Sequence, residues 1–308
     1  MTAVKSRGSS SRENMLFLYM EKVISHYYTN GQCRTGETYA STLNSFKRFR
    51  SGKDTSLSEM DCEMLEAYEG YLRRNGLSPN TMSFYMKHMR AIYNRAVDDG
   101  LIIDRKPFRR ITTSIEKTVK RALSLKSLKR LKALDLSTAR SKQFARDMFM
   151  FSFYTRGMSF VDIAYLRKKD LKGNILFYRR KKTSQLLTVH WEPCMQEIAD
   201  RYRADASSPY MLSIIKEPDG DIRRQYKNAM FLINRQLKAI GQEIGMDRSL
   251  TMYCARHSWA SIARDEGIPV SIISEGMGHD SEKTTQIYLA SLKADVIDKA
   301  NRKILKLL

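Results

Sequence analysis

Residues 278–288 read Gly-His-Asp-Ser-Glu-Lys-Thr-Thr-Gln-Ile-Tyr, and residues 256–260 read Arg-His-Ser-Trp-Ala. Tyr288 stands nine residues after His279 and thirty-two residues after Arg256. A tyrosine phenol can form a covalent bond to phosphorus, which conserves the energy of a phosphodiester for rejoining. An arginine can hold the extra negative charge of the transition state through two parallel hydrogen bonds. The two stretches therefore hold residue types suited to phosphoryl transfer, with Tyr288 as a tyrosine that could act as the attacking group.

The charge of the chain favours a polyanionic partner. Its 308 residues carry 54 Lys and Arg against 33 Asp and Glu, a formal net charge of +21. Such a field attracts nucleic acid first and an anionic membrane second. A membrane is disfavoured because the longest apolar run, residues 148–154, is far too short to span a bilayer and indicates a buried helix. Residues 1–13 are polar and basic, unlike a secretory signal.

Helical periodicity organises the first third of the chain. Residues 1–13 form a basic tail, and apolar residues then recur at three- and four-residue steps through residues 14–106. We expect a compact four-helix domain there, with the turn at residues 76–81 opening the last helix. Residues 107–122 are expected to be a linker, since they carry five bases and one acid. A solvated linker can have this composition by chance, but contact with DNA phosphates would require it. The linker bases that we place on DNA are Arg109, Arg110, Lys120 and Arg121.

Residues 123–308 show a mostly helical pattern interrupted by one β-hairpin. β-prone runs at residues 175–178 and 186–189 flank a basic connection, residues 179–185. Further phosphate contacts are expected from Arg179, Arg180 and Lys181. The predicted fold class is therefore mainly α with a small β-hairpin or sheet (α+β). The last segment, residues 291–308, is amphipathic and either folds back on its own domain or docks on a neighbouring subunit.

Several motifs together resemble one family. The Arg-His-Ser-Trp-Ala stretch is similar to the Arg-His-x-Phe-Ala box of the tyrosine recombinases, or phage integrases. Gly278-His279 resembles their Gly-His box, and Tyr288 falls at the nucleophile spacing. Lys182-Thr183 resembles the Lys-Thr of the family's β-hairpin, and Gly-Leu-Ser-Pro-Asn-Thr is common at a helix start in its core-binding domain. The resemblance covers nearly the whole chain and is closest to short Xer-like or invertase-like members.

The resemblance implies a role for each matching residue. Arg256 becomes the second catalytic arginine and His279 the histidine of the third box. Lys182 becomes the general acid that protonates the leaving 5′ oxygen, with Lys181 as a neighbouring alternative. His257, which follows the arginine, is usually structural in this family.

The first arginine of the family is missing. Its box reads Thr-Gly-Leu-Arg-x-x-Glu-Leu, whereas residues 156–163 read Arg-Gly-Met-Ser-Phe-Val-Asp-Ile. Ser159 therefore stands at the arginine position and Asp162 at the acidic position, as in a branch found on mobile elements and invertible DNA of gut anaerobes. Gly157 is expected to end one helix, and Ser159 and Asp162 to form a Ser-x-x-Asp cap for the next. Ser159 is more readily an N-cap than a catalytic group. Arg156 is the first candidate for supplying the missing charge, and a surface or phosphate contact is its alternative.

A second departure concerns Tyr253, which stands three residues before Arg256 where the family usually has histidine. A phenol can donate a hydrogen bond to a phosphate oxygen, but it is a poor proton shuttle near neutral pH. The adjacent His257 is not an automatic substitute, because neighbouring side chains on a helix point about 100° apart.

The implied protein is a site-specific DNA recombinase. It would combine a helical SAM-like core-binding domain with a catalytic domain at residues 123–308, and clamp double-stranded recombination sites. It would act through a 3′-phosphotyrosine and a Holliday junction, in a homotetramer joined by the C-terminal tails, with accessory DNA-bending proteins as further partners. Integration, excision and inversion are equally compatible with the sequence. Two alternatives stay open: DNA relaxation as by a type IB topoisomerase, and a DNA-binding regulator that lost catalysis.

No cofactor or metal is expected. Phosphotyrosine chemistry needs neither a metal nor a nucleotide, and the chain has no Gly-rich phosphate loop. The remaining histidines lack metal-ligand spacing, and these are His26, His88 and His190. Four scattered cysteines fit free thiols in a reducing cytoplasm. The resemblance implies a bacterial protein close to the nucleoid.

Overall fold

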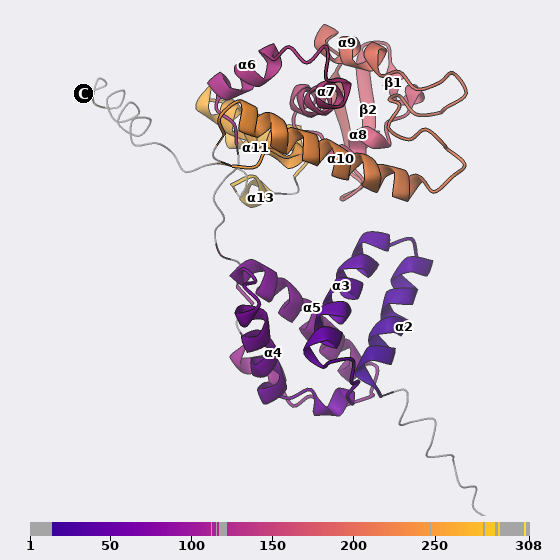
Figure 1. Ribbon diagram of the computed structural model, residues 1–308, viewed down its shortest axis with the longest axis vertical. Coiled ribbons are helices and arrows are strands. Elements are labelled where there is room, and N and C mark those ends of the chain that lie inside the picture. Colours follow the sequence, from indigo (N-terminus) through magenta and orange to yellow (C-terminus); the bar gives the residue numbers. More distant parts are fainter. Residues whose placement is uncertain are drawn as a thin grey trace, which may run out of the picture. The chain divides into compact units, whose positions relative to one another are not determined.

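The computed structural model describes residues 14–111, 113–114, 116, 122–246, 248–279, 281–286, 289 and 305. The chain forms two compact units that divide after residue 118. The described residues are mostly helical and include one three-stranded sheet (Figure 1). The predicted fold class is therefore confirmed. Within the described residues, no helix is both long enough and apolar enough to cross a membrane.

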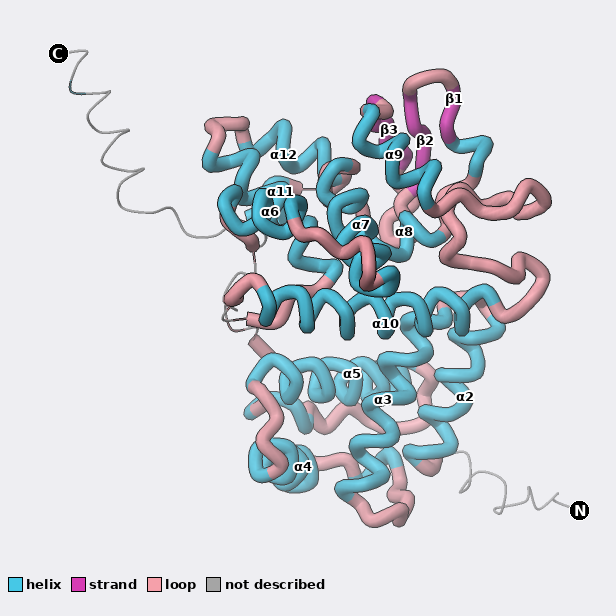
Figure 2. The backbone as a smooth tube through the Cα atoms, turned by 45° about the horizontal axis from the view of Figure 1, so that its top comes forward, coloured by secondary structure: helices cyan, strands magenta, loops and turns pink. Residues whose placement is uncertain are grey.

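Four helices build the part of the N-terminal unit that the structure describes, as predicted (Figure 2). They are α2 (Leu16–Thr29), α3 (Cys33–Phe49), α4 (Cys62–Arg74) and α5 (Pro79–Asp98), with short 3-10 turns at Leu57–Glu59 and Pro107–Arg110. Local capping sets the helix starts, since Asp61 accepts a hydrogen bond from the Met64 amide and Ser78 accepts one from Thr81. The apolar stripes of these helices meet in one core around Phe46, Leu65 and Tyr68.

Residues 107–111, which composition assigns to the linker, pack into the N-terminal unit instead. Phe108 and Ile111 are buried in its core. Arg90 of α5 donates from Nη2 to the carbonyl oxygens of both, at 3.2 and 3.0 Å. The five basic residues of 107–122 predict a linker, but Phe108 and Ile111 place the first part of that stretch in the core of the N-terminal unit. Of the expected linker contacts, Lys120 and Arg121 lie outside the described residues.

The second unit is built around α7 (Arg140–Tyr154), which carries the long apolar run and is buried as predicted. Helices α10 (Ile222–Glu243) and α11 (Met252–Asp265) pack most extensively against it. The other helices of the unit are α6 (Leu125–Ala133), α8 (Phe160–Ala164), α9 (Pro193–Arg201), α12 (Val270–Met277) and α13 (Glu282–Gln286), with a 3-10 turn at Lys168–Asp170.

The predicted β-hairpin is present and gains a third strand. Strands β1 (Leu171–Lys172), β2 (Ile175–Arg179) and β3 (Leu186–His190) form an antiparallel sheet in that order. Arg179 pairs with Leu186 at the turn end of the hairpin. Leu176 and Tyr178 face the core, whereas Ile175 and Arg179 are exposed. The residue after Arg179 on this alternating strand is therefore expected to face inward.

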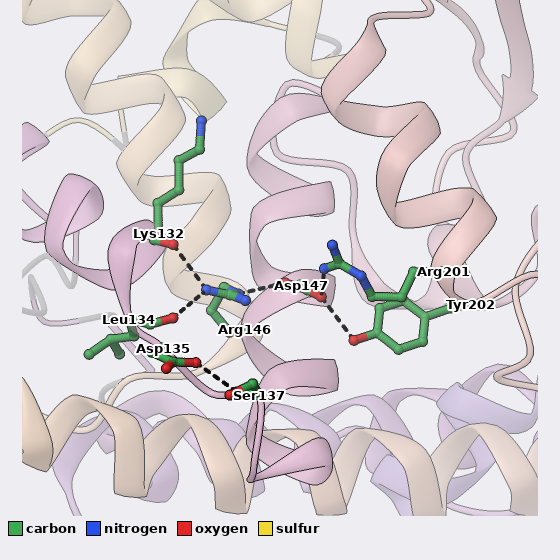
Figure 3. A network of polar contacts seen from close by, with 8 residues as sticks. All are labelled: Lys132, Leu134, Asp135, Ser137, Arg146, Asp147, Arg201 and Tyr202. Carbon is green, nitrogen blue, oxygen red and sulfur yellow. Dashed lines mark hydrogen bonds and ion pairs between the residues drawn. The ribbon is translucent and has the colours of Figure 1, made fainter.

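A buried carboxylate ties the helical scaffold together (Figure 3). Asp147 of α7 is 3% exposed and accepts hydrogen bonds from Arg146, Arg201 and the Tyr202 hydroxyl, at 2.5, 2.6 and 2.8 Å. Arg146 also donates to two backbone carbonyls between α6 and α7. The network links α6, α7 and α9, so the elements that carry the site below rest on a fixed frame.

Candidate active site

Arg256 is the centre of the site. It lies on α11 and is only 4% exposed. Its Nη1 donates to the Gly157 carbonyl at 2.8 Å, and its Nη2 donates to the Met277 carbonyl at 2.6 Å. Because three separate segments contribute to these contacts, the guanidinium plane has little freedom to turn. A charged group that is buried and fixed in this way is pre-organised to receive an anion.

His279 is held in one tautomer. Its Nε2 lies 2.8 Å from Arg256 Nη2, and its Nδ1 lies 2.8 Å from the hydroxyl oxygen of Thr285. A guanidinium can only donate, so Nε2 accepts and the ring proton is on Nδ1. Burial, followed by the positive charges of Arg256, Arg180 and Lys182, lowers the pKa of His279 to about 3. The imidazole is therefore neutral at physiological pH.

Two glycines allow this packing. Gly157 has φ +76°, and a Cβ there would lie 2.8 Å from the Cα of Arg256. Gly278 has φ +64°, and its Cβ would lie 2.8 Å from Leu187 Cδ1 and 2.9 Å from Arg180 Cδ. Both positions have a left-handed backbone, and the close neighbour is a backbone atom at Gly157 and side-chain atoms at Gly278. The glycine of the Gly-His stretch is thus needed because the β-hairpin packs directly on it.

The hairpin delivers an arginine to the same place. Arg180 follows β2, is 8% exposed and donates from Nη1 to the Gly278 carbonyl. Asp162 of α8 fixes the hairpin turn, since its Oδ1 accepts a hydrogen bond from the Lys181 amide at 2.8 Å. We expected Arg180 to contact phosphates together with Arg179, but its guanidinium is buried beside the Gly-His stretch.

Ser159 and Asp162 interact differently from the predicted helix cap. Ser159 is the N-cap residue of α8, but its side chain accepts no hydrogen bond from the helix backbone. Its hydroxyl donates to Asp162 Oδ2 at 2.6 Å. The predicted side-chain cap is therefore wrong. The carboxylate also accepts the Lys181 amide, so the serine and the hairpin share one acceptor.

Tyr178 is buried close to Asp162 and to three arginines of the site. Burial and the nearby Asp162 raise the pKa of Tyr178 to about 12, and Arg256, Arg180 and Arg156 act in the opposite direction. Arg156 itself has φ +59°, and its Nη1 donates to the Thr188 carbonyl on β3 at 3.3 Å. Its guanidinium is thus in the region of the site but is directed to the edge of the hairpin.

The remaining predicted residues are placed less centrally. Lys181 and Lys182 lie in the exposed hairpin turn, and the Lys181 ammonium stands 4.3 Å from the centre of the Tyr165 ring. Tyr253 is 54% exposed and packs its ring edge-to-face on the buried His257, with centroids 4.8 Å apart. This burial agrees with a structural function for His257.

Three predicted residues cannot be placed within the second unit's site. Tyr288 lies outside the described residues, although Thr285 before it and Leu289 after it are both buried. Arg109 and Arg110 are exposed residues of the N-terminal unit, and Arg110 is 3.7 Å from Glu66.

Sequence reasoning did not single out Thr285 and did not assign Arg180 to the catalytic pocket. The strand pattern contains the signal for Arg180, because Leu176, Tyr178 and Arg180 alternate on one face. Thr285 follows another threonine on a short helix, and the sequence does not distinguish the two.

Comparison with known proteins agrees with this geometry. Residues 15–119 match the phage integrase SAM-like domain, and residues 122–295 match the phage integrase family. The chain belongs to the phage integrase family. Among curated relatives of this integrase-family chain, tyrosine recombinase XerD of Listeria innocua is 22% identical, over 81% of this chain and 87% of the relative. Tyrosine recombinase XerA of Thermococcus kodakarensis is 26% identical, over 71% and 73%.

Solved structures share the fold. The integrase of transposon Tn1549, in complex with transposon right end DNA, superposes with a TM-score of 0.68 and 14% identity, covering 95% of this integrase-family chain and 99% of that one. A lambda integrase tetramer bound to a Holliday junction gives a TM-score of 0.67 at 13% identity, covering 94% and 82%. Within the described residues of the present chain, no three His, Cys, Asp or Glu side chains are grouped to hold a metal ion.

Proposed function

We propose that this protein is a site-specific DNA recombinase that cleaves and rejoins DNA through a 3′-phosphotyrosine intermediate on Tyr288. The observation that carries the proposal is the buried Arg256, fixed by backbone carbonyls and by a neutral His279. Such a group stabilises charge that develops on a phosphoryl oxygen. Family membership and the recombinase relatives support the same reaction.

Each step of the reaction has a candidate group in this chain. The Tyr288 oxygen attacks phosphorus and gives its proton to solvent water, and the bond between phosphorus and the 5′ oxygen breaks. Lys182, in the hairpin turn beside the site, gives a proton to the leaving oxygen. Arg256 holds the non-bridging oxygens while their charge increases. Rejoining is the reverse, with a 5′ hydroxyl as the nucleophile.

Arg180 takes the place of Arg156 as the first candidate for the missing arginine. Its positive charge lowers the pKa of His279, as that of Arg256 does, whereas Arg156 has no part in that shift. Arg180 is also buried against Gly278, while Arg156 is directed to a carbonyl of β3. The hairpin therefore supports two functions, an inward arginine for the transition state and an outward lysine for the proton.

Double-stranded DNA is the proposed partner, and its phosphates suit the charge of +21. We further propose a tetramer joined through the C-terminal tails, by analogy with the lambda integrase tetramer on a Holliday junction. Accessory DNA-bending proteins and action at the bacterial nucleoid are proposals of the same kind. Relaxation of supercoils without exchange of partners is disfavoured, because the relatives bear the name of recombinases.

A covalent-trapping experiment tests the proposal. The full-length protein is incubated with nicked suicide DNA that carries candidate sites from the flanks of its own gene, and denaturing gels detect protein joined to DNA. Wild type is expected to form the adduct and Tyr288→Phe is not. An adduct that survives in Tyr288→Phe refutes the nucleophile, and a wild type that binds these sites without any adduct refutes the enzyme. Paired sites that yield relaxed circles but no junctions would favour a topoisomerase.

A further inference from the structure

Thr285 occupies an unusual position for a hydroxyl group. It is fully buried on α13, a helix of only five residues, and it stands three residues before Tyr288 in the sequence. Its Oγ1 lies 2.8 Å from Nδ1 of His279. Because Nε2 of that ring accepts from Arg256, Nδ1 carries the proton and donates it to the threonine oxygen. The direction of the hydrogen bond is therefore fixed by the arginine.

Leu289, which lies beyond this helix in the sequence, provides a second attachment. The Leu289 amide donates to the Thr285 carbonyl at 3.3 Å. The Leu289 side chain is 5% exposed and packs in a small apolar cluster with Ala260 and Ala263 of α11 and with residues of α12. Thr285 and Leu289 flank Tyr288 in the sequence, and both are anchored to elements that also hold Arg256. Thr285 of α13 is thus connected to the arginine pocket by a polar contact, and Leu289 is connected to α11 and α12 by an apolar one.

We propose that Thr285 is a positioning residue for the cleavage reaction, joining the Arg256–His279 pair to the helix that precedes the nucleophile. The inference rests on the proposed function. The chain of contacts runs from the Gly157 carbonyl through Arg256 and His279 to Thr285. A shift of α13 would therefore disturb the imidazole, and a turned imidazole would release the guanidinium. The hydroxyl couples the groups that bind the phosphate to the segment that attacks it.

Two substitutions separate the hydroxyl from the shape of the side chain. Thr285→Val keeps the branched shape and removes the oxygen that lies 2.8 Å from Nδ1 of His279. Thr285→Ser keeps the acceptor and removes only a methyl group. Thr284→Val is the matched control, because it makes the same change at the adjacent threonine, whose hydroxyl instead lies 3.2 Å from that of Ser281.

The experiment measures single-turnover adduct formation on suicide DNA, the Kd for the same DNA, and the ¹⁵N NMR signals of His279, all in the full-length protein. Thr285→Val is expected to slow adduct formation about 10- to 100-fold, the effect of misplacing a catalytic group by about 1 Å. Its Kd should stay within about twofold, because phosphate contacts elsewhere set the affinity. The Nδ1–H signal of His279 should shift. Thr285→Ser and Thr284→Val should retain the rate and the signal of the wild type.

Several results would overturn the proposal. It fails if Thr285→Val cleaves as fast as wild type, if Thr285→Ser is as slow as Thr285→Val, or if Thr284→Val is equally impaired. A wild type that forms no adduct refutes the proposed function instead. In that case the NMR signals still decide, since an unchanged His279 signal in Thr285→Val shows that the hydroxyl does not hold the imidazole.

Discussion

Replacing Gly157 by alanine should damage both stability and catalysis, through one contact. The backbone there has φ +76°, which costs an alanine about 1–2 kcal/mol. The new Cβ would also lie 2.8 Å from the Cα of Arg256 and 2.9 Å from its Cγ. Since a backbone atom cannot swing aside, relief of this contact costs about 1–3 kcal/mol more. The expected total is about 2–5 kcal/mol of unfolding free energy, and Arg256 moves away from the Gly157 carbonyl, Met277 and His279.

Gly245→Ala isolates the contact. Gly245 has φ +68° after α10, and a Cβ there would meet no atom within 4 Å. This control therefore carries the backbone strain without the collision. Denaturant unfolding should show the control losing about 1–2 kcal/mol and Gly157→Ala losing about 1–3 kcal/mol more. Under conditions where both are folded, adduct formation should fall at least about tenfold in Gly157→Ala only. Equal stability and equal cleavage in the two variants would refute the proposed packing of Gly157 on Arg256.

Three further predictions address the charges of the site. Arg180→Ala should slow adduct formation about 100-fold, as loss of one transition-state donor does. The control Arg179→Ala should mainly weaken DNA binding and reduce its salt dependence. If both variants slow cleavage equally, Arg180 does not belong to the catalytic site. NMR of the free protein should show no titration of His279 between about pH 5 and pH 8. The pKa of His279 is lower in the folded protein than in the unfolded chain, so the free energy of unfolding decreases as pH falls from about 6.5 towards 3. The His279→Gln variant should lose less of its unfolding free energy than wild type over the same pH range. A mixture of Tyr288→Phe and Arg256→Ala proteins should form no adduct. The reason is that Thr285 and Leu289, on either side of Tyr288 in the sequence, are buried in the unit that carries Arg256. Adduct from the mixture would show that the tyrosine of one subunit acts in the site of another.

Much of the fold follows from local patterns in the sequence. The helical stripes, a helix start within residues 76–81 and the β-hairpin depend on residues close together in the chain, and all are present, with Ser78 as the N-cap. The extent of the linker does not follow in this way. Phe108 and Ile111 stand among basic residues, and only the contact with α5 shows that they belong to the core of the N-terminal unit. Composition averages over such a stretch, whereas burial is decided by individual apolar side chains.

The candidate site could also be predicted from the sequence only in part. Spacing identified Arg256 and His279, because their family boxes are continuous in sequence. It could not rank Arg156 against Arg180, since that choice depends on which arginine packs beside the Gly278 carbonyl. Strand alternation favours Arg180, but the run Arg179-Arg180-Lys181-Lys182 has the composition of a phosphate-binding loop. Thr285 and Thr284 are likewise equivalent in sequence and differ only in which neighbour their hydroxyl reaches.

Asp162 connects the absence of an arginine at position 159 with the presence of one at position 180. Its carboxylate accepts the Ser159 hydroxyl with one oxygen and the Lys181 amide with the other. The second bond fixes the hairpin turn immediately after Arg180, whose side chain then faces the Gly278 carbonyl. A serine at 159 satisfies the carboxylate through a short neutral donor and adds no cation of its own. Under the proposed function the positive charge is placed by the strand and not by the helix, and Ser159 and Arg180 form a single arrangement around Asp162.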